Sequence, residues 1–258
     1  MSMKFLKNTC IILSIITLAS CSDSDEGPVA EVKMKSDPIA NPIGVNEANL
    51  FAGKTLAGWH DFNKTGKVEN WAIEDSAMVC LGAARDAAGG DMVSDIEYEN
   101  FDLSWQWKVT KGGNSGVMYH VVESPKYIAP YETGSEYQMI DDIGFPEKVE
   151  DWQKSGVDYA MNVPNSSKKL LPVGEWNSSR IVFNKGKVEH WLNGEAVVYF
   201  EAWSDEWNKK KAKGKWKDYP DYGKAKKGRT AFRIIVIKCI LKISGLKNCH
   251  STNRKWYV

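Results

Sequence analysis

Short β-prone runs separated by turn residues dominate this chain and constrain its fold more than any other feature. The runs are rich in β-branched and aromatic side chains and fall at residues 70–74, 77–81, 101–109, 115–122, 135–141, 179–184, 187–192 and 195–201. Asn184-Lys185-Gly186 and Asn193-Gly194 separate the last three runs with the residue types that tight hairpin turns favour. Many short strands joined by turns predict an all-β fold, a β-sandwich or jelly roll.

One segment has a helical pattern instead. Residues 203–217 (WSDEWNKKKAKGKWK) predict a short amphipathic helix, inserted at the surface with its tryptophans turned inward. The lysines of this segment do not indicate a nucleic-acid partner, because the formal net charge of the whole chain is only +1.

The start of the chain has the features of an export signal. A basic segment, residues 1–8, precedes the apolar run 10–19, which is too short to span a bilayer permanently. Leu18-Ala19-Ser20-Cys21 resembles the lipobox of bacterial lipoproteins. We therefore expect a signal peptide at 1–20 and a lipid on Cys21, which would anchor the protein to the outer membrane on its periplasmic or cell-surface side. The alternative is an ordinary secretory signal cut near Ser20.

The residues that follow Cys21 predict a tether. Residues 21–47 are polar and rich in proline and acidic side chains, a composition that cannot bury a core. Of the cysteines beyond this tether, Cys80, Cys239 and Cys249, no two have C-x-x-C spacing. They indicate neither a disulfide scaffold nor a metal site.

Alternation along the predicted strands gives each strand an apolar and a polar side. Leu103, Trp105 and Trp107 share one side of their strand, whereas Lys108 lies on the other. We expect a continuous outward platform made of Lys108, Glu136, Gln138 and Trp191. Carboxylates and amides bind hydroxyl groups and an indole stacks on a pyranose, so such a platform suits a sugar. The alternative is a solvated strand face, since half the positions of any such strand look alike.

Several segments stand in a specific order along the chain: LFAGKTLAGWHDF (50–62), GGNSGVMYHVVE (112–123), YETGSEYQMIDD (131–142) and GEWNSSRIVFNKGKVEHWLNGEAVVYFE (174–201). Together they resemble the 3-keto-disaccharide hydrolase family of secreted bacterial proteins. The resemblance implies a concanavalin A-like jelly-roll domain, which we place at 48–231. It also implies a carbohydrate substrate, whose glycosidic bond is cleaved after its carbon 3 has been oxidised to a ketone.

That reaction requires a base for the proton on carbon 2, an acid for the leaving group and a group that holds the enolate oxygen. The candidate residues are Glu136, Asp141 or Asp142 as the base, His120 as acid, base or metal ligand, Lys108 and Gln138 as oxygen-holding groups, and Asn114 and Tyr159 at the rim. A divalent cation could replace the cationic residue, but no spacing fixes such a site.

Some of these residues also have structural interpretations. Asp141 and Asp142 can end a strand with turn-type hydrogen bonds, and His120 can be a satisfied histidine within a sheet. His190 alternates with core positions, which favours a structural role. Two other functions stay open: a lectin-like module that only binds glycans, and a structural surface lipoprotein.

The end of the chain departs from the family pattern. Family members usually finish with a segment like ALQDHG and a strand like VxFRNI, whereas residues 229–258 contain seven basic residues and no acidic one. If the reading frame shifts by one nucleotide near the Ala231 codon, the downstream codons can encode the ending that family members have. We therefore hypothesise that a single-base deletion produced residues 232–258, which the gene's nucleotides would test. The β-prone stretch 232–243 can fill the place of the lost strand, but in the wrong side-chain register. If the C-terminus is truly altered, we therefore expect this chain to be destabilised or inactive while its intact relatives are enzymes.

Overall fold

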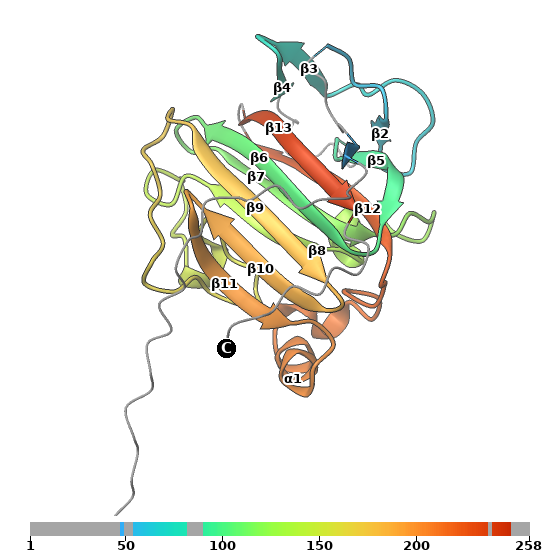
Figure 1. Cartoon of the computed structure of the whole chain (residues 1–258), viewed down its shortest axis with the longest axis vertical. Coiled ribbons are helices and arrows are strands. Elements are labelled where there is room, and N and C mark those ends of the chain that lie inside the picture. Colours follow the sequence, from blue (N-terminus) through green and yellow to red (C-terminus); the bar gives the residue numbers. More distant parts are fainter. Residues whose placement is uncertain (1–46, 49–53, 82–89, 237–238, 249–258) are drawn as a thin grey trace, which may run out of the picture. The chain divides into compact units, whose positions relative to one another are not determined.

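Two antiparallel sheets form the fold in the computed structural model, which describes residues 47–48, 54–81, 90–236 and 239–248 (Figure 1). The expected signal peptide at 1–20, the Cys21 expected to carry a lipid and nearly all of the expected tether lie outside the described residues. The mostly-β architecture confirms the predicted sandwich.

The larger sheet has eight strands. In spatial order they are β11 (Glu195–Glu201), β10 (Lys187–Leu192), β9 (Asn177–Asn184), β6 (Phe101–Val109), β13 (Cys239–Asn248), β4 (Ala77–Cys80) and β3 (Trp71–Glu74), with β1 (Glu47–Ala48) also pairing with β13. The turns that join β9 to β10 and β10 to β11 are tight. Their central residues, Lys185-Gly186 and Asn193-Gly194, all have positive φ, as two-residue turns matching the strand twist require.

The smaller sheet has five strands. In spatial order they are β2 (Trp59–Asp61), β5 (Met92–Tyr98), β12 (Gly228–Val236), β7 (Asn114–Val121) and β8 (Ser135–Ile140). β8 is an edge strand, and the segment beyond it partly covers that edge. Gly156 N–H donates to the Gln138 carbonyl and Tyr159 N–H donates to the Glu136 carbonyl, both over 2.9 Å.

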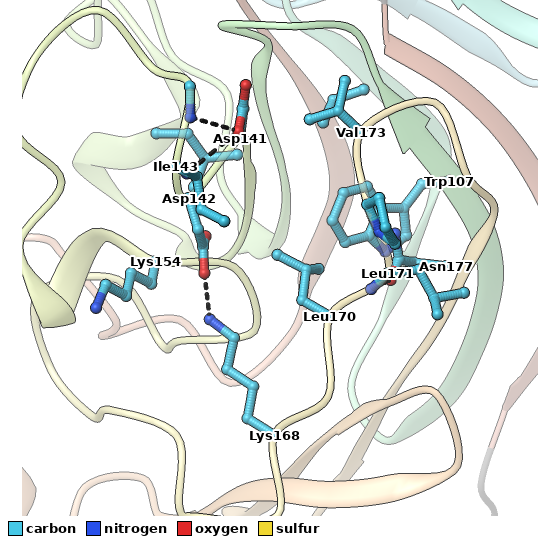
Figure 2. Close-up of a pocket in the computed structure, with 14 residues that line it drawn as sticks. Trp107, Asp141, Asp142, Ile143, Lys154, Lys168, Leu170, Leu171, Val173 and Asn177 are labelled. Carbon is cyan, nitrogen blue, oxygen red and sulfur yellow. Dashed lines mark hydrogen bonds and ion pairs between the residues drawn. The ribbon is translucent and has the colours of Figure 1, made fainter.

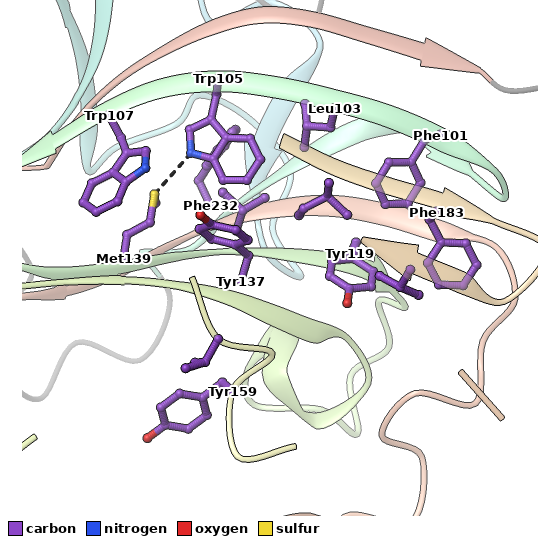
Figure 3. Packing of buried hydrophobic residues seen from close by; sticks show 14 of the residues in the cluster. Phe101, Leu103, Trp105, Trp107, Tyr119, Tyr137, Met139, Tyr159, Phe183 and Phe232 are labelled. Atoms are coloured by element: carbon purple, nitrogen blue, oxygen red, sulfur yellow. Dashed lines mark hydrogen bonds between the residues drawn. The ribbon is translucent and has the colours of Figure 1, made fainter. Parts of the chain in front are cut away.

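Aromatic side chains fill the space between the sheets (Figure 3). Trp105 and Trp107 of β6 are buried, as alternation along this strand predicts. Their indole N–H groups find partners inside the core: Trp105 Nε1 lies 3.2 Å from Met139 Sδ, and Trp107 Nε1 donates to Ser179 Oγ over 2.8 Å. The two buried indoles of β6 therefore leave no N–H donor unsatisfied in the core.

The predicted helical insertion is confirmed as α1 (Asp205–Lys213) followed by the 3-10 helix η3 (Lys215–Asp218). Ser204 Oγ caps α1 by accepting from the Trp207 N–H over 3.2 Å. Trp207 and Trp216 are buried, as expected, and both stack on Tyr222. Two further 3-10 helices are η1 (Pro130–Glu132) and η2 (Asp151–Gln153). None of the helices in the described part of the chain combines the length and apolar character of a membrane span.

The end of the chain supplies one interior strand to each sheet. β12 runs through position 231 and lies between β5 and β7, while β13 lies between β6 and β4. Residues 232–236 and 239–248 therefore occupy places within the sandwich. The origin of this tail in a single-base deletion stays a prediction.

Candidate active site

The predicted polar platform divides between the two sheets, so this part of the sequence interpretation is wrong. Lys108 on β6 and Trp191 on β10 belong to the eight-stranded sheet. Glu136 and Gln138 on β8 belong to the five-stranded sheet. Each side chain points away from the core by strand alternation, and the outward sides of two stacked sheets face opposite directions. The two pairs therefore do not share a surface.

Lys108 and Trp191 have partners in, or directly next to, the eight-stranded sheet. Lys108 Nζ lies 4.9 Å from the ring centroid of Trp176. Trp191 Nε1 donates to Glu189 Oε2 over 2.8 Å, and the Arg180 guanidinium lies 5.7 Å from the Trp191 ring centroid. The cationic group required beside a base on β8 must therefore come from another strand.

Arg233 of β12 is that group. Its Nη1 lies 3.0 Å from Oε1 and 2.9 Å from Oε2 of Glu136, on the outer side of the five-stranded sheet. Glu136 is fully buried, whereas a fifth of the Arg233 side chain remains exposed. Gly116 of β7 is the register partner of both Arg233 and Gln138. A Cβ atom at Gly116 would overlap the Glu136 carboxylate, so glycine makes room for the pair.

The electrostatic surroundings hold Arg233 in its charged form. Burial disfavours the charge, but the carboxylates of Glu136 and Asp91 raise the pKa of the Arg233 guanidinium. The Tyr131 ring lies 5.7 Å from the guanidinium carbon. Sequence reasoning missed Arg233 because it lies in the tail treated as aberrant, and it assigned the cationic role to Lys108. Under the hypothesis that a single-base deletion produced residues 232–258, Arg233 is a residue of this chain and not part of the family's site.

Aromatic side chains continue from Tyr131 along one side of the pair. Ring centroids are 6.5 Å apart between Tyr131 and Trp216, 6.2 Å between Trp216 and Tyr159, and 5.4 Å between Tyr159 and Trp152. Lys215 Nζ lies 4.4 Å from the Tyr159 ring centroid, and Trp152 is 39 % exposed. Trp216 and Tyr159 are buried, so only the partly exposed Tyr131 and the exposed Trp152 can offer apolar surface to the C–H face of a sugar.

Two buried amide oxygens on this side of the sheet have no protein partner. Gln138 Oε1 and Asn114 Oδ1 are buried and accept no hydrogen bond from any residue that the structure describes. By alternation along β8 and β7, both side chains lie on the same side of the sheet as Glu136. An unsatisfied buried acceptor costs about 1–3 kcal/mol, so a hydroxyl group of a ligand would gain by bonding there.

His120 lies apart from this pair, in the aromatic interior. It has φ of +55° in an irregular part of β7, and its ring lies 4.3 Å from the Phe183 ring centroid. The Nε2 atom lies 2.9 Å from the Glu99 carbonyl oxygen, to which it donates when protonated. Burial lowers the pKa of His120 to about 4, which keeps the ring neutral at pH 7. These contacts match the structural interpretation of this histidine. His190 is also buried, with Nδ1 3.2 Å from the Gly156 carbonyl oxygen.

Asp141 and Asp142 lie at the end of β8, on the wall of a pocket of about 690 Å³ (Figure 2). Asp141 accepts from the N–H groups of Gly112, Ile143 and Gly144, and these bonds lower its pKa although burial acts to raise it. Asp142 pairs with Lys168 over 2.6 Å. Asp141 is therefore committed to backbone N–H groups, whereas Asp142 and Glu136 each lie beside one cation. We take Glu136 as the candidate base because only Nη1 of its partner Arg233 contacts it, which leaves guanidinium N–H groups for an oxyanion.

A metal site does not emerge from the described part of the chain. No group of three or more histidine, cysteine, aspartate or glutamate side chains in residues 47–48, 54–81, 90–236 and 239–248 could hold a metal ion. The divalent cation considered from the sequence has no ligand set among these residues.

Comparison with known proteins places the chain in a family. Residues 46–234 match the model of a 3-keto-alpha-glucoside-1,2-lyase-like domain. The chain is 33% identical over 172 residues to a 3-keto-disaccharide hydrolase from Bacteroides thetaiotaomicron, a match that covers 61% of this chain and 59% of that protein.

Two solved structures from Parabacteroides distasonis ATCC 8503, both described as candidate glycosyl hydrolases, are also similar. The first is 43% identical with a TM-score of 0.75, and the match covers 79% of this chain and 94% of the other. The second is 21% identical with a TM-score of 0.60, covers 78% of this chain and 98% of the other, and shares the fold. The chain therefore belongs to the 3-keto-alpha-glucoside-1,2-lyase-like family, as its motifs predicted.

Proposed function

We propose that the protein is a glycosidase that cleaves 3-keto-glycosides, with Glu136 as the base and Arg233 as the group that holds the enolate oxygen. The observation that carries this proposal is the Glu136–Arg233 pair, with its 2.9 Å and 3.0 Å contacts on the outer side of the five-stranded sheet. Membership of the family and the named relative, a 3-keto-disaccharide hydrolase, support the same substrate class.

The proposed reaction begins with elimination. Glu136 takes the proton from carbon 2, which the ketone at carbon 3 makes acidic, and the electron pair moves onto the ketone oxygen as an enolate. The enolate then reforms the ketone, carbon 1 and carbon 2 become doubly bonded, and the bond between carbon 1 and the glycosidic oxygen breaks. The leaving oxygen takes a proton from water. The hydroxide formed from that water adds to carbon 1, the electron pair of the double bond moves through carbon 2 onto the ketone oxygen, and Glu136 returns its proton to carbon 2 as the ketone reforms, so the net reaction is hydrolysis by one water.

Arg233 suits the enolate-holding role because a guanidinium has five N–H donors and Nη1 alone contacts Glu136. The remaining donors can reach a ketone oxygen placed beside the carboxylate. A fixed positive charge in a buried site stabilises a developing oxyanion without reorganising water. The base and the cation therefore act on neighbouring atoms, carbon 2 and the oxygen on carbon 3.

The rest of the site suits binding of the sugar. Gln138 Oε1 can accept a hydrogen bond from a hydroxyl group, and the partly exposed Tyr131 ring beside Arg233 can stack on the sugar. The polar and aromatic sides of a pyranose thus both find partners around the Glu136–Arg233 pair.

The experiment that tests the reaction uses a 3-keto-glucoside carrying deuterium at carbon 2. We expect release of the aglycone with a primary kinetic isotope effect, because the bond from carbon 2 to hydrogen breaks in the proposed slow step. Release with no isotope effect, combined with hydrolysis of ordinary unoxidised glucosides, would contradict elimination. Binding without any release would instead support the lectin-like alternative.

We also propose that Cys21 carries a lipid that anchors the protein to the bacterial outer membrane, on its periplasmic or cell-surface side. The support is the lipobox-like segment Leu18-Ala19-Ser20-Cys21. Cells that express the chain with an alkyne-labelled palmitate should incorporate the label, and Cys21→Ser should abolish incorporation while Cys80→Ser leaves it unchanged. Labelling of the Cys21→Ser protein at the level of the unaltered chain would refute the anchor.

A further inference from the structure

Lys215 of η3 is an exposed cation at the rim of the candidate active site. Its Nζ lies 4.4 Å from the ring centroid of Tyr159 and 5.0 Å from that of Trp216. Within the part of the chain that the structure describes, this ammonium forms neither an ion pair nor a hydrogen bond. The ammonium is therefore held over two aromatic rings, and its three N–H donors stay available to a ligand.

Tyr159 connects Lys215 to the Glu136–Arg233 pair. The Tyr159 N–H donates to the Glu136 carbonyl over 2.9 Å. Burial acts to lower the pKa of the Arg233 guanidinium, whereas the Glu136 and Asp91 carboxylates and the Tyr159 phenol raise it. The Tyr159 hydroxyl therefore lies within electrostatic range of the guanidinium, and Lys215 covers the ring that bears this hydroxyl.

Tyr131 gives a second connection, which is open to solvent. The Arg233 guanidinium carbon lies 5.7 Å from the Tyr131 ring centroid, and that centroid lies 6.5 Å from the ring of Trp216, which Lys215 also contacts. A fifth of the Arg233 side chain is exposed, Tyr131 is partly exposed and Lys215 is exposed. A ligand at the exposed part of Arg233 can therefore approach Lys215 along the surface.

The segment that contains Lys215 is strongly basic. Residues 205–227 include nine lysines and four acidic residues. Two of the four carboxylates already have partners, since Glu206 pairs with Lys210 over 2.9 Å and Asp221 pairs with Lys126 over 2.9 Å. The excess of positive charge favours negatively charged ligands over neutral ones at this rim.

Donors also outnumber acceptors beside Lys215. The Tyr159 hydroxyl forms no hydrogen bond with any residue that the structure describes. Arg233 contacts Glu136 through Nη1, and its other N–H groups serve the ketone oxygen in the proposed reaction. The Tyr159 hydroxyl and the Lys215 ammonium are therefore left for a second group on the ligand. Two donors and one positive charge suit an anionic oxygen, because hydrogen bonds that involve a charge are the stronger ones.

We infer that the sugar that lies at the Glu136–Arg233 pair carries an acidic substituent, a carboxylate or a sulfate, and that Lys215 binds it. This inference rests on the proposed function and narrows its substrate class to acidic glycosides. Lys215 and Arg233 lie on either side of a single aromatic ring, Tyr159, and a pyranose is similar in size to such a ring. The acidic group therefore belongs on the sugar itself.

The binding test compares three methyl β-D-glycosides by calorimetry with the full chain: the neutral glucoside, the glucuronide and the glucoside 6-sulfate. All three lack the ketone that elimination needs. We expect the acidic glycosides to bind about fivefold more tightly than the neutral one at low ionic strength, and the gain should shrink at high salt. The ratio between the two acidic glycosides distinguishes a carboxylate site from a sulfate site. Equal affinity for all three, or no measurable binding of either acidic glycoside, would overturn the inference.

Variants at two lysines show whether Lys215 itself is responsible. Lys215→Gln should remove most of the gain for the acidic glycosides, and Lys215→Arg should keep it because the charge remains. Lys209→Gln is the matched control, since Lys209 is an exposed lysine of the same basic segment but belongs to α1, and it should keep the gain. An equal loss in Lys215→Gln and Lys209→Gln would assign the gain to the general positive field and refute the role of Lys215.

A kinetic measurement separates this inference from the proposed function. With 3-keto forms of the three glycosides, Lys215→Gln should raise KM for the acidic substrates about fivefold, with kcat and the neutral substrate unchanged. If the protein cleaves all three equally and Lys215→Gln changes none, the acidic-sugar assignment fails and the proposed function stands. If it cleaves none while the binding preference and its loss in Lys215→Gln persist, the proposed function fails and Lys215 remains part of a binding site for acidic sugars.

Discussion

Glu136→Gln is expected to lower kcat for a 3-keto-glucoside about 10³-fold, within the range contributed by general bases, while the protein stays folded. Glutamine keeps the size of the side chain and can still accept a hydrogen bond from Arg233 Nη1, but it cannot take the proton from carbon 2. Because the base acts in the transition state, the loss should appear in kcat more than in KM. Steady-state kinetics of aglycone release, with circular dichroism as the folding check, measure this effect.

Two further variants serve as a comparison and a control for Glu136→Gln. Arg233→Lys keeps one positive charge but loses the planar set of donors, so we expect a smaller loss than for Glu136→Gln. Glu189→Gln alters a carboxylate of the eight-stranded sheet, which faces the other way, and should leave kcat unchanged. Retention of a tenth or more of the original kcat by Glu136→Gln would exclude this residue as the base.

Asp158→Asn is expected to stabilise the folded protein at pH 8 by on the order of 3–4 kcal/mol. Burial raises the pKa of Asp158 to about 7, and Oδ1 has no partner among the described residues. Between pH 4 and pH 7 the folded protein therefore keeps a proton that the unfolded chain has released. Stability from this group is full below pH 4, falls as pH rises through this window, and is lost above pH 7. Asparagine carries no charge to bury and can still accept from Asn162, which donates to Asp158 Oδ2 over 2.8 Å.

The difference in the free energy of unfolding between Asp158→Asn and the unaltered protein isolates the contribution of Asp158. His120 and His190 are buried with pKa values lowered by burial to about 4, so they act in the opposite direction and add stability as pH rises to 6.5. Their contribution is the same in both proteins and cancels. Urea unfolding at pH 4 and pH 8 should show a gain for Asp158→Asn at pH 8 only. The exposed Asp218→Asn should show none, and a gain of equal size at both pH values would refute the assignment.

Most of the fold could be predicted from local sequence. The predicted runs correspond to β3, β4 and β6 to β11, because each combines β-branched or aromatic residues with clear turn residues at its ends. β5 escaped prediction because Asp95, Ile96 and Glu97 interrupt its alternation with three exposed positions in succession. The register of β12 and β13 could not be predicted either, since an apolar run of this kind fits a sheet in more than one way.

The candidate site was harder to predict because it depends on which sheet each strand joins. Glu136 was correctly placed on the outward side of its strand, but alternation cannot tell that Lys108 faces the opposite direction. Alternation along β7 likewise predicts that the His120 side chain points outward. In the structure, three residue steps of β7, from Met118 to Val121, lie opposite two steps of β12, and this irregularity turns the His120 ring into the interior. No residue type in this segment signals that bulge.

The places of β12 and β13 also bear on how the protein reaches its native state during synthesis. Each lies between strands made much earlier, β12 between β5 and β7 and β13 between β6 and β4. While a ribosome still holds residues 228–248, both sheets have an open gap with unpaired backbone groups on either side. Native pairing can be completed only after these residues have emerged, so the nascent chain depends on protection from aggregation until then.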